Sequence, residues 1–64
     1  MKRAPLCICA KEIAMITGRS LRTAERLMND MRFFFSKEKH QFITIREFCE
    51  YCGLDYGEVI SGYF

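Results

Sequence analysis

The sequence predicts an all-α fold of about four short helices, arranged as two helix-turn-helix-like halves. Apolar residues recur every three or four positions through two stretches, 10–35 and 44–62, as they do along one face of a helix. In each stretch a glycine, Gly18 or Gly53, follows the first helical pattern, where a backbone with positive φ often ends a helix. With 64 residues, the chain is expected to form a single domain over residues 1–64.

The first stretch predicts two helices joined by a tight turn. A short helix is expected at 10–16 and a longer one from Leu21 to Phe35, so the motif occupies residues 10–36. Ser20 has the N-cap position of the longer helix, where its hydroxyl accepts a backbone N–H that the helix leaves free. An apolar stripe on this helix is expected to face the core: Leu21, Ala24, Leu27, Met28 and Met31.

The segment before the first helix is expected to be extended. Pro5 keeps the preceding residue out of a helix, which predicts a loose arm over residues 1–5. The apolar run 6–9 that follows is expected to pack on the core.

The polar run 36–41 predicts a linker between the halves. Its lysines, Lys37 and Lys39, either contact phosphate or belong to an ordinary hydrated loop. In a second interpretation, residues 41–44 form strands of a small hairpin, and the fold becomes a winged helix-turn-helix. His40 has no acidic or serine partner near it in the sequence and is expected on the surface.

The second stretch, 44–62, predicts another pair of helices. The run TIRE at 44–47 has the Thr-x-x-Glu spacing of a capping box, which predicts a helix over 45–52. The run DYGE at 55–58 has an equivalent spacing and is expected to open a last helix that runs toward Ser61.

Sliding the sequence on itself by 35 residues reveals an internal repeat. The segment 8–14 then lies over the segment 43–49, and Gly18 lies over Gly53. The second half is therefore predicted to be another helix-turn-helix unit, but with an outer face that has lost its charge. The pairs that differ are Arg19 and Leu54, Arg22 and Gly57, and Arg26 and Ser61. Because there are only two copies, chance similarity is the competing explanation.

The charge of the chain is unevenly distributed. Residues 1–40 contain nine Lys or Arg against four Asp or Glu, a balance of +5. Residues 41–64 contain one Arg against four Asp or Glu, a balance of −3. A basic region of this kind is typical of a surface that faces phosphates, and an unevenly charged solvated surface is the alternative.

Within the first half, residues 10–27 resemble a known family. Seven positions follow the register of helix-turn-helix regulators, which have in order a small residue, Gly, Ser, Thr, an apolar residue, Arg and Leu. In this chain they are Ala14, Gly18, Ser20, Thr23, Ala24, Arg26 and Leu27. The run is similar in particular to small excisionase-like and MerR-like DNA-binding proteins. Arg19 departs from the pattern, since many such proteins have an apolar residue after the glycine. The resemblance implies a small bacterial or phage-type transcriptional regulator, or an accessory factor in recombination.

The interpretation places the helix from Leu21 to Phe35 in the major groove of double-stranded DNA. Arg22 and Arg26 are expected to contact guanine edges and Asn29 an adenine edge, pairings that discriminate between bases by about 1–3 kcal/mol. Other side chains are expected to contact the phosphate backbone, which positions the protein without reading sequence: Lys11, Arg19, Ser20, Thr23, Lys37 and Lys39. One unit has a small footprint, so a homodimer or a partner protein is expected.

The alternative function is a protein-interaction or homodimerisation module without DNA binding. Its candidate contact residues are aromatic: Phe33, Phe34, Tyr63 and Phe64. Phe33 projects on the same side of its helix as Arg22 and Arg26. It is expected either to be covered by the second half, to meet a second copy, or to line a binding surface. Salt distinguishes the two functions, because only DNA binding weakens steeply as salt rises.

Four cysteines raise the hypothesis of a structural zinc ion, since four thiolates can form a tetrahedral site. Their spacing argues against it, because Cys7 and Cys9 are closer than the usual zinc knuckle. Cys49 also corresponds in the repeat to Ala14, a core position. No metal is expected, and buried reduced thiols are the favoured interpretation of all four: Cys7, Cys9, Cys49 and Cys52.

The sequence contains no pattern for catalysis. HExxH, GxSxG, P-loop and nucleotide-binding patterns are missing, so neither an enzyme nor a cofactor is expected. The apolar runs fall far short of the ~18 residues that span a membrane, and the N-terminal one is too short for a signal peptide. A cytoplasmic protein without a membrane partner is expected.

Overall fold

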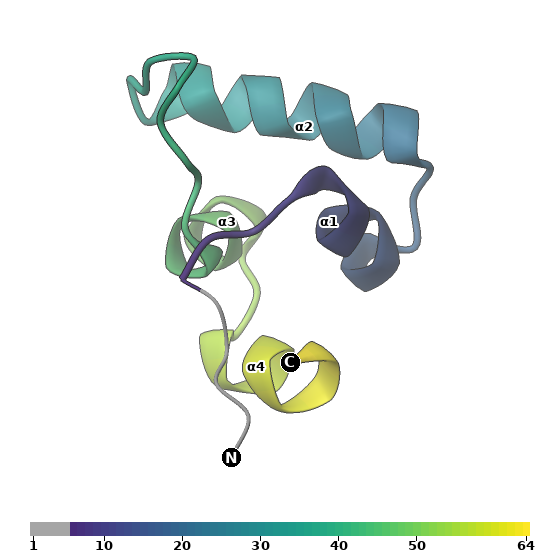
Figure 1. Ribbon diagram of the computed structural model, residues 1–64. Coiled ribbons are helices and arrows are strands. Elements are labelled where there is room, and N and C mark those ends of the chain that lie inside the picture. Colours follow the sequence, from purple (N-terminus) through teal and green to yellow (C-terminus); the bar gives the residue numbers. More distant parts are fainter. Residues whose placement is uncertain (1–5) are drawn as a thin grey trace.

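The computed structural model describes residues 6–64, and within them the chain is all-helical (Figure 1). The four helices are α1 (Ala10–Thr17), α2 (Leu21–Phe34), α3 (Ile45–Cys52) and α4 (Tyr56–Tyr63). This confirms the predicted all-α fold class. The arm expected before Leu6 lies outside the described residues. None of the four helices is long and apolar enough to cross a membrane.

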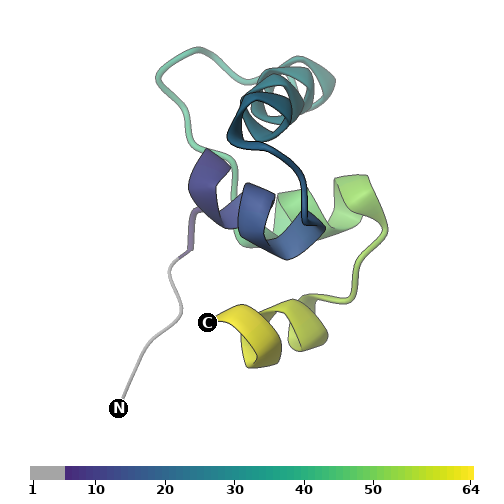
Figure 2. The same ribbon diagram turned by 90° about the vertical axis from the view of Figure 1, so that its right-hand side faces the viewer.

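The helices form three layers, which are visible from two directions (Figures 1 and 2). Helices α1 and α3 lie next to each other in the middle layer. Helix α2 covers one side of this layer, and α4 lies on the opposite side. Because α2 is an outer layer, one of its faces contacts the core and the other points away from the molecule.

The local structure of the two halves agrees with the internal repeat at the first helix and the turn. Helices α1 and α3 have the same length, and their first residues are 35 positions apart. Each ends in a left-handed glycine, Gly18 with a φ of 70° and Gly53 with a φ of 73°. The next residue closes each helix in the same way, because the N–H of Arg19 donates to Ala14 O and that of Leu54 donates to Cys49 O.

The predicted N-caps of α2 and α3 are present. Ser20 Oγ accepts the Thr23 N–H at 3.2 Å. Thr44 and Glu47 form the complete capping box, with hydrogen bonds of 3.0 and 2.9 Å between each side chain and the other residue's backbone. The start of α2 is therefore fixed by a single hydroxyl, and that of α3 by two reciprocal bonds.

The capping box predicted for α4 forms only in part. Asp55 Oδ2 accepts the Glu58 N–H at 2.9 Å, whereas the described residues show no hydrogen bond returning from the Glu58 side chain. A related contact at α1 was not predicted: the Cys9 N–H donates to Glu12 Oε1 at 3.0 Å. It was missed because cysteine is not a preferred N-cap residue.

The halves are joined by a short antiparallel contact between 6–8 and 43–45. The Ile8 N–H donates to Ile43 O at 3.0 Å, and the Ile45 N–H donates to Leu6 O at 2.9 Å. This corrects the second interpretation of the fold. Within the described chain, residues 41–44 do not pair with each other in a wing; Thr44 forms an isolated bridge with Cys7 instead.

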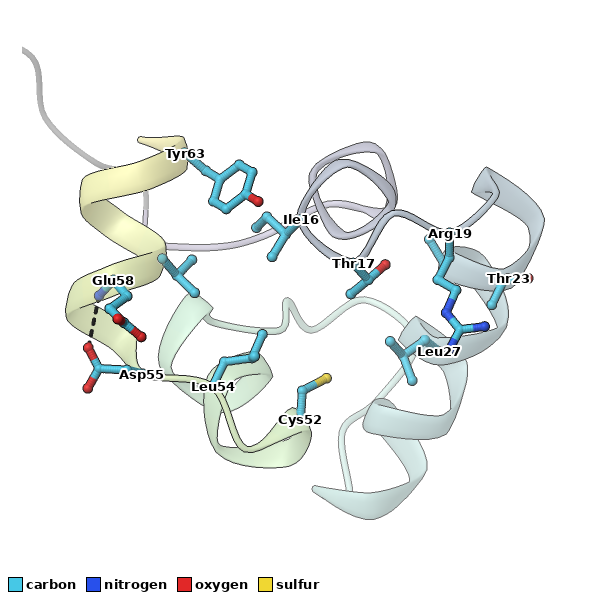
Figure 3. Close-up of a pocket in the computed structure, with 12 residues that line it drawn as sticks. Ile16, Thr17, Arg19, Thr23, Leu27, Cys52, Leu54, Asp55, Glu58 and Tyr63 are labelled. Atoms are coloured by element: carbon cyan, nitrogen blue, oxygen red, sulfur yellow. Dashed lines mark hydrogen bonds between the residues drawn. The ribbon is translucent and has the colours of Figure 1, made fainter.

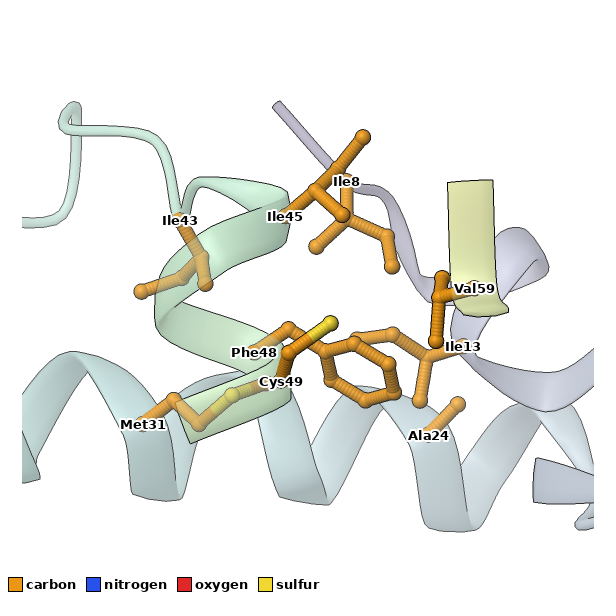
Figure 4. Packing of buried hydrophobic residues seen from close by; sticks show 9 residues of the cluster. All are labelled: Ile8, Ile13, Ala24, Met31, Ile43, Ile45, Phe48, Cys49 and Val59. Carbon is orange, nitrogen blue, oxygen red and sulfur yellow. The ribbon is translucent and has the colours of Figure 1, made fainter. Parts of the chain in front are cut away.

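One hydrophobic core is shared by both halves (Figure 4). Three pairs of repeat-equivalent residues are buried in it: Ile8 and Ile43, Ile13 and Phe48, and Ala24 and Val59. Met31, Ile45 and Cys49 complete the buried cluster. Since each half supplies only part of this small core, we expect neither half to be stable alone.

Candidate nucleic-acid interface

The outward face of α2 carries a row of exposed side chains. Positions 22, 26, 29 and 33 are four, three and four residues apart, which places them on one side of a helix. All four are exposed, whereas Ala24 and Met31 on the opposite side are buried. The row consists of Arg22, Arg26, Asn29 and Phe33.

The two arginines of this row have no ion-pair partner among residues 6–64, where Lys37 and Glu47 form the ion pair that the structure shows. Arg22 also lies in the first turn of α2, which contains no acidic residue. The first turns of α1, α3 and α4 each contain a glutamate. Cations at the positive end of a helix, and like charges four residues apart, both reduce its stability. An anion bound at this end of α2 would relieve that cost.

Asn29 has a hydrogen-bond partner within the protein. Its Oδ1 accepts a hydrogen bond from Arg32 Nη1 at 3.1 Å. Bidentate recognition of adenine uses both the oxygen and the nitrogen of the amide. Asn29 must therefore leave Arg32 before it can make the predicted base contact, and this requirement could not be deduced from the sequence.

Most of the predicted backbone contacts lie near the start of α2 or of α1. Arg19, Ser20 and Thr23 are exposed around the first turn of α2, and Lys11 is exposed in the first turn of α1. Lys39 is exposed in the linker. These positions leave all five side chains accessible to a ligand.

Lys37 has a structural partner. Its Nζ lies 3.0 Å from Glu47 Oε1, and the two side chains are only 20% and 25% exposed. Burial by itself raises the pKa of Glu47, but the Thr44 N–H and the Lys37 ammonium outweigh it and hold this pKa below 4.5. The ion pair ties the linker to α3, so Lys37 is less available for phosphate than the prediction implies.

A groove of about 690 Å³ opens beside the start of α2 (Figure 3). Arg19 and Thr23 lie on one side of it, and Asp55 and Glu58 lie on the other. Its floor includes Ala24 and Val59 together with other apolar side chains. The groove was not predicted from the sequence. The repeat contained one signal for it, because Ala24 and Val59, which line the groove from the two halves of the chain, are equivalent positions.

Two exposed phenylalanines, Phe33 and Phe34, form what we call the aromatic patch at the end of α2. Phe33 is 88% exposed and Phe34 is 63% exposed. The Phe34 ring packs edge-on against Phe35 and Tyr51, with centroids 5.0 and 5.1 Å apart. The second half therefore supports Phe34 but does not cover Phe33. Within the described chain, this excludes the prediction that Phe33 is covered by the second half.

The two aromatic residues at the C-terminal end lie elsewhere. Tyr63 is partly exposed and lines the groove, and Phe64 is half-buried against the core. Neither belongs to the aromatic patch. Packing within the chain accounts for Phe64, whereas Tyr63 remains 44% exposed.

The cysteines do not gather into a metal site. Within residues 6–64 the structure contains no cluster of three or more potential metal ligands. Cys49 is buried and Cys52 is half-buried, and burial raises the pKa of both thiols, which disfavours the thiolate form that binds metal. The expectation of buried thiols is wrong for Cys9, which is exposed because its side chain lies at the N-cap of α1.

Comparisons of the chain with models of protein families, with curated proteins and with solved structures find no match. The functional argument therefore rests on the residues and their arrangement.

Proposed function

We propose that this protein binds double-stranded DNA through the outward face of α2, with the first turns of that helix in the major groove. The observation that supports this most is the position of Arg22 and Arg26. Both are exposed on an outer helix and have no ion pair within residues 6–64, and Arg22 lies in the first turn of α2, where a cation reduces helix stability unless an anion is bound.

In this proposal, the side chains that contact DNA divide into two groups. Arg22 and Arg26 contact guanine edges, and Asn29 contacts adenine after releasing Arg32. The surrounding groups bind phosphates and fix the orientation of the helix: Lys11, Arg19, Ser20, Thr23 and Lys39. The basic start of α2 faces the phosphates, and the groove separates it from Asp55 and Glu58 of the second half.

The cellular role that we propose is that of a transcriptional regulator or a recombination accessory factor. Its support is the resemblance of residues 10–27 to small helix-turn-helix proteins with these functions. Both roles require the same DNA-binding surface, so a single binding experiment tests their common premise.

The test is fluorescence anisotropy of a labelled random-sequence duplex at two salt concentrations. We expect wild-type affinity to fall steeply with salt, by a slope of about 0.9 for each neutralised phosphate on logarithmic axes. Arg22→Ala/Arg26→Ala should weaken low-salt binding at least tenfold, which corresponds to about 1.4 kcal/mol. The matched control is Arg46→Glu, which removes the same two units of charge from the second half.

The control should bind nearly as well as the wild type. Equal losses in the control and in the double variant would show that only net charge matters and would contradict a specific role for α2. Absence of binding at low salt would contradict the function itself.

Self-association without DNA is the second candidate function, and the aromatic patch favours it. Such a module would bury apolar surface, so its affinity would change little with salt. Sedimentation of the free chain, measured alongside the anisotropy, distinguishes this function from DNA binding.

A further inference from the structure

Arg32 is bound to Asn29 in a way that leaves one of its own donors unsatisfied. Its Nη1 donates to Asn29 Oδ1 at 3.1 Å, while its Nε is buried and has no hydrogen-bond partner within residues 6–64. A buried donor without an acceptor carries a free-energy cost, because it has lost its hydration and gained nothing in return. Asn29 accepts one N–H of the guanidinium, whereas a phosphate accepts two in parallel. A phosphate is therefore a better partner for Arg32 than Asn29 is.

Arg32 lies on a flank of α2, beside the outward row that contains Asn29. It follows Asn29 by three residues, which places it nearly one turn further along the helix and about 60° around its axis. Thr23 has the corresponding place on the opposite flank of the row, where the start of α2 borders the groove. The outward row therefore has, on each side, a polar side chain that can bind phosphate.

The two flanks of a helix in the major groove face the two phosphate backbones. A helix with its side chains is about 10–12 Å across, and the groove is about 12 Å wide. A helix that reads base edges with its outward row therefore meets phosphates on both sides. On the flank of Arg32, α2 also carries Leu21, Glu25 and Met28, so Arg32 is the one basic residue of α2 on this side. The Glu25 carboxylate repels phosphate, which leaves Arg32 as the group of this flank that can bind it.

The surroundings of Arg32 allow its guanidinium to turn. Arg32 and Asn29 both line a cavity of about 520 Å³, which lies between α2 and residues 8–10 and 42. Arg32 is not part of the buried core, and it lies in the last turn of α2, where a cation is favourable whether or not it is bonded to Asn29. Breaking the bond to Asn29 therefore disturbs neither the core nor the end of the helix.

We propose that Arg32 controls when Asn29 can read adenine. In the free protein Arg32 holds the amide oxygen of Asn29, and on DNA it transfers to a backbone phosphate and releases this oxygen. The exchange gives the guanidinium an ionic, bidentate acceptor and lets Asn29 bond both N6 and N7 of adenine. Arg32 is thus a positioning residue, because it couples base reading to the arrival of the phosphate. This proposal rests on the proposed function.

The sign of the coupling between the two residues tests the exchange. Arg32→Met and Asn29→Ala each lose one DNA contact, but each variant also avoids the cost of breaking the bond between the two side chains. The double variant avoids this cost only once. By anisotropy, it should bind a random-sequence duplex about fivefold more weakly than the product of the two single losses, which is the worth of one hydrogen bond. If Arg32 instead stayed on Asn29 and oriented it, the double variant would bind more tightly than that product. Additive losses, or binding tighter than the product, would overturn the proposal.

Salt dependence supplies a second measurement that a purely structural role would not change. Arg32→Met should lower the logarithmic salt slope by about 0.9, the value of one neutralised phosphate, and Arg32→Lys should retain the slope because it keeps the charge. The matched control is Arg46→Met, which removes an arginine that lies over the Tyr56 ring in the second half and should leave the slope unchanged.

None of the substituted side chains belongs to the buried core, so the variants should keep the fold, which circular dichroism checks. An unchanged slope in Arg32→Met, or an equal fall in Arg32→Lys or in the control, would overturn the proposal and leave the DNA-binding function intact. A wild-type protein that does not bind the duplex would contradict the function on which the proposal rests.

Discussion

The two halves of the molecule share a backbone plan and differ in what they expose. In both, a short helix ends at a left-handed glycine and an N-capped second helix follows. The buried positions are apolar in both halves, but α2 exposes two arginines, Arg22 and Arg26, whereas α4 contains no basic residue. The comparison of buried and exposed positions indicates that the core maintains the fold, while the solvent-facing positions determine which half can bind an anion.

Differences at the helix ends follow the same division. α3 has a complete capping box and α4 an aspartate N-cap with a glutamate in the first turn, both of which stabilise helix starts. α1 also has an acidic residue in its first turn, Glu12, which accepts the Cys9 N–H, whereas α2 starts with Arg22 and has no acidic residue there. Among the four helices, α2 therefore carries charges at its start that stability alone does not favour.

The largest expected effect tests whether the two halves fold as one unit. Ile13 and Phe48 are equivalent in the repeat and fully buried, so Ile13→Ala should cost about 2–5 kcal/mol and Phe48→Ala about 3–5 kcal/mol. For a domain of this size, either loss is expected to approach the whole free energy of unfolding. Urea denaturation followed by circular dichroism measures it, with Phe33→Ala as an exposed control.

Both variants should lose all four helices in a single transition, because the core is shared. A Phe48→Ala chain that kept α1 and α2 folded would show that the halves are independent domains and would contradict the shared core.

The next effect tests the equivalence of the two turns. Gly18→Ala and Gly53→Ala each force an L side chain into a left-handed backbone, at a cost of about 1–2 kcal/mol. No heavy atom lies within 4 Å of the added Cβ at either position, so backbone strain alone sets the cost. Thermal unfolding should show two equal losses, and a difference of more than about 1 kcal/mol would mean that the turns are not equivalent.

A smaller effect on stability is expected from changes at the N-caps of α1 and α3. Replacing Cys9 by the residue of the other half, Cys9→Thr, should raise the free energy of unfolding by about 0.5–1 kcal/mol, because threonine is the better N-cap. Thr44→Ala should lower it by about 1 kcal/mol. Thermal melts of the two variants, recorded under reducing conditions, measure both effects. A stabilising Thr44→Ala would contradict the role assigned to the caps.

The smallest effect concerns pH and belongs to the second half alone. The pKa of Glu47 is lowered in the folded protein, so its contribution to stability is present above the ordinary value of 4.5 and is lost as pH falls through the folded pKa. The Lys37 pair is partly exposed and contributes at most about 1 kcal/mol. Denaturation at several pH values below 5 should show a flatter acid dependence for Glu47→Gln than for the wild type. Identical slopes would contradict the role of Glu47.

Local sequence patterns were sufficient to predict the helices and the repeat. Periodicity located α1–α4, the glycines located the two helix ends, and the hydroxyls of Ser20 and Thr44 located two N-caps, because each of these features depends on neighbours within four residues. The same reasoning placed Arg22 and Arg26 on the outward face of α2, as the exposed positions confirm.

Contacts between distant segments could not be predicted in this way. The groove, the bridge from Cys7 to Thr44 and the ion pair of Lys37 with Glu47 depend on how the halves pack, which no local pattern specifies. The bond from Arg32 to Asn29 spans three residues, but it depends on a choice between side-chain conformations. For the candidate site, the sequence therefore predicted the exposed charges and missed the partners that restrain them.

The most direct test of the difference between the halves is a nuclear magnetic resonance titration of the ¹⁵N-labelled protein with a random-sequence duplex at low salt. We expect chemical shifts to change at Lys11 and over residues 19–29, whereas the equivalent residues 54–61 should be unaffected. Changes of equal size in both halves, or changes confined to α4, would contradict the claim that the first half binds DNA and the second half supports it.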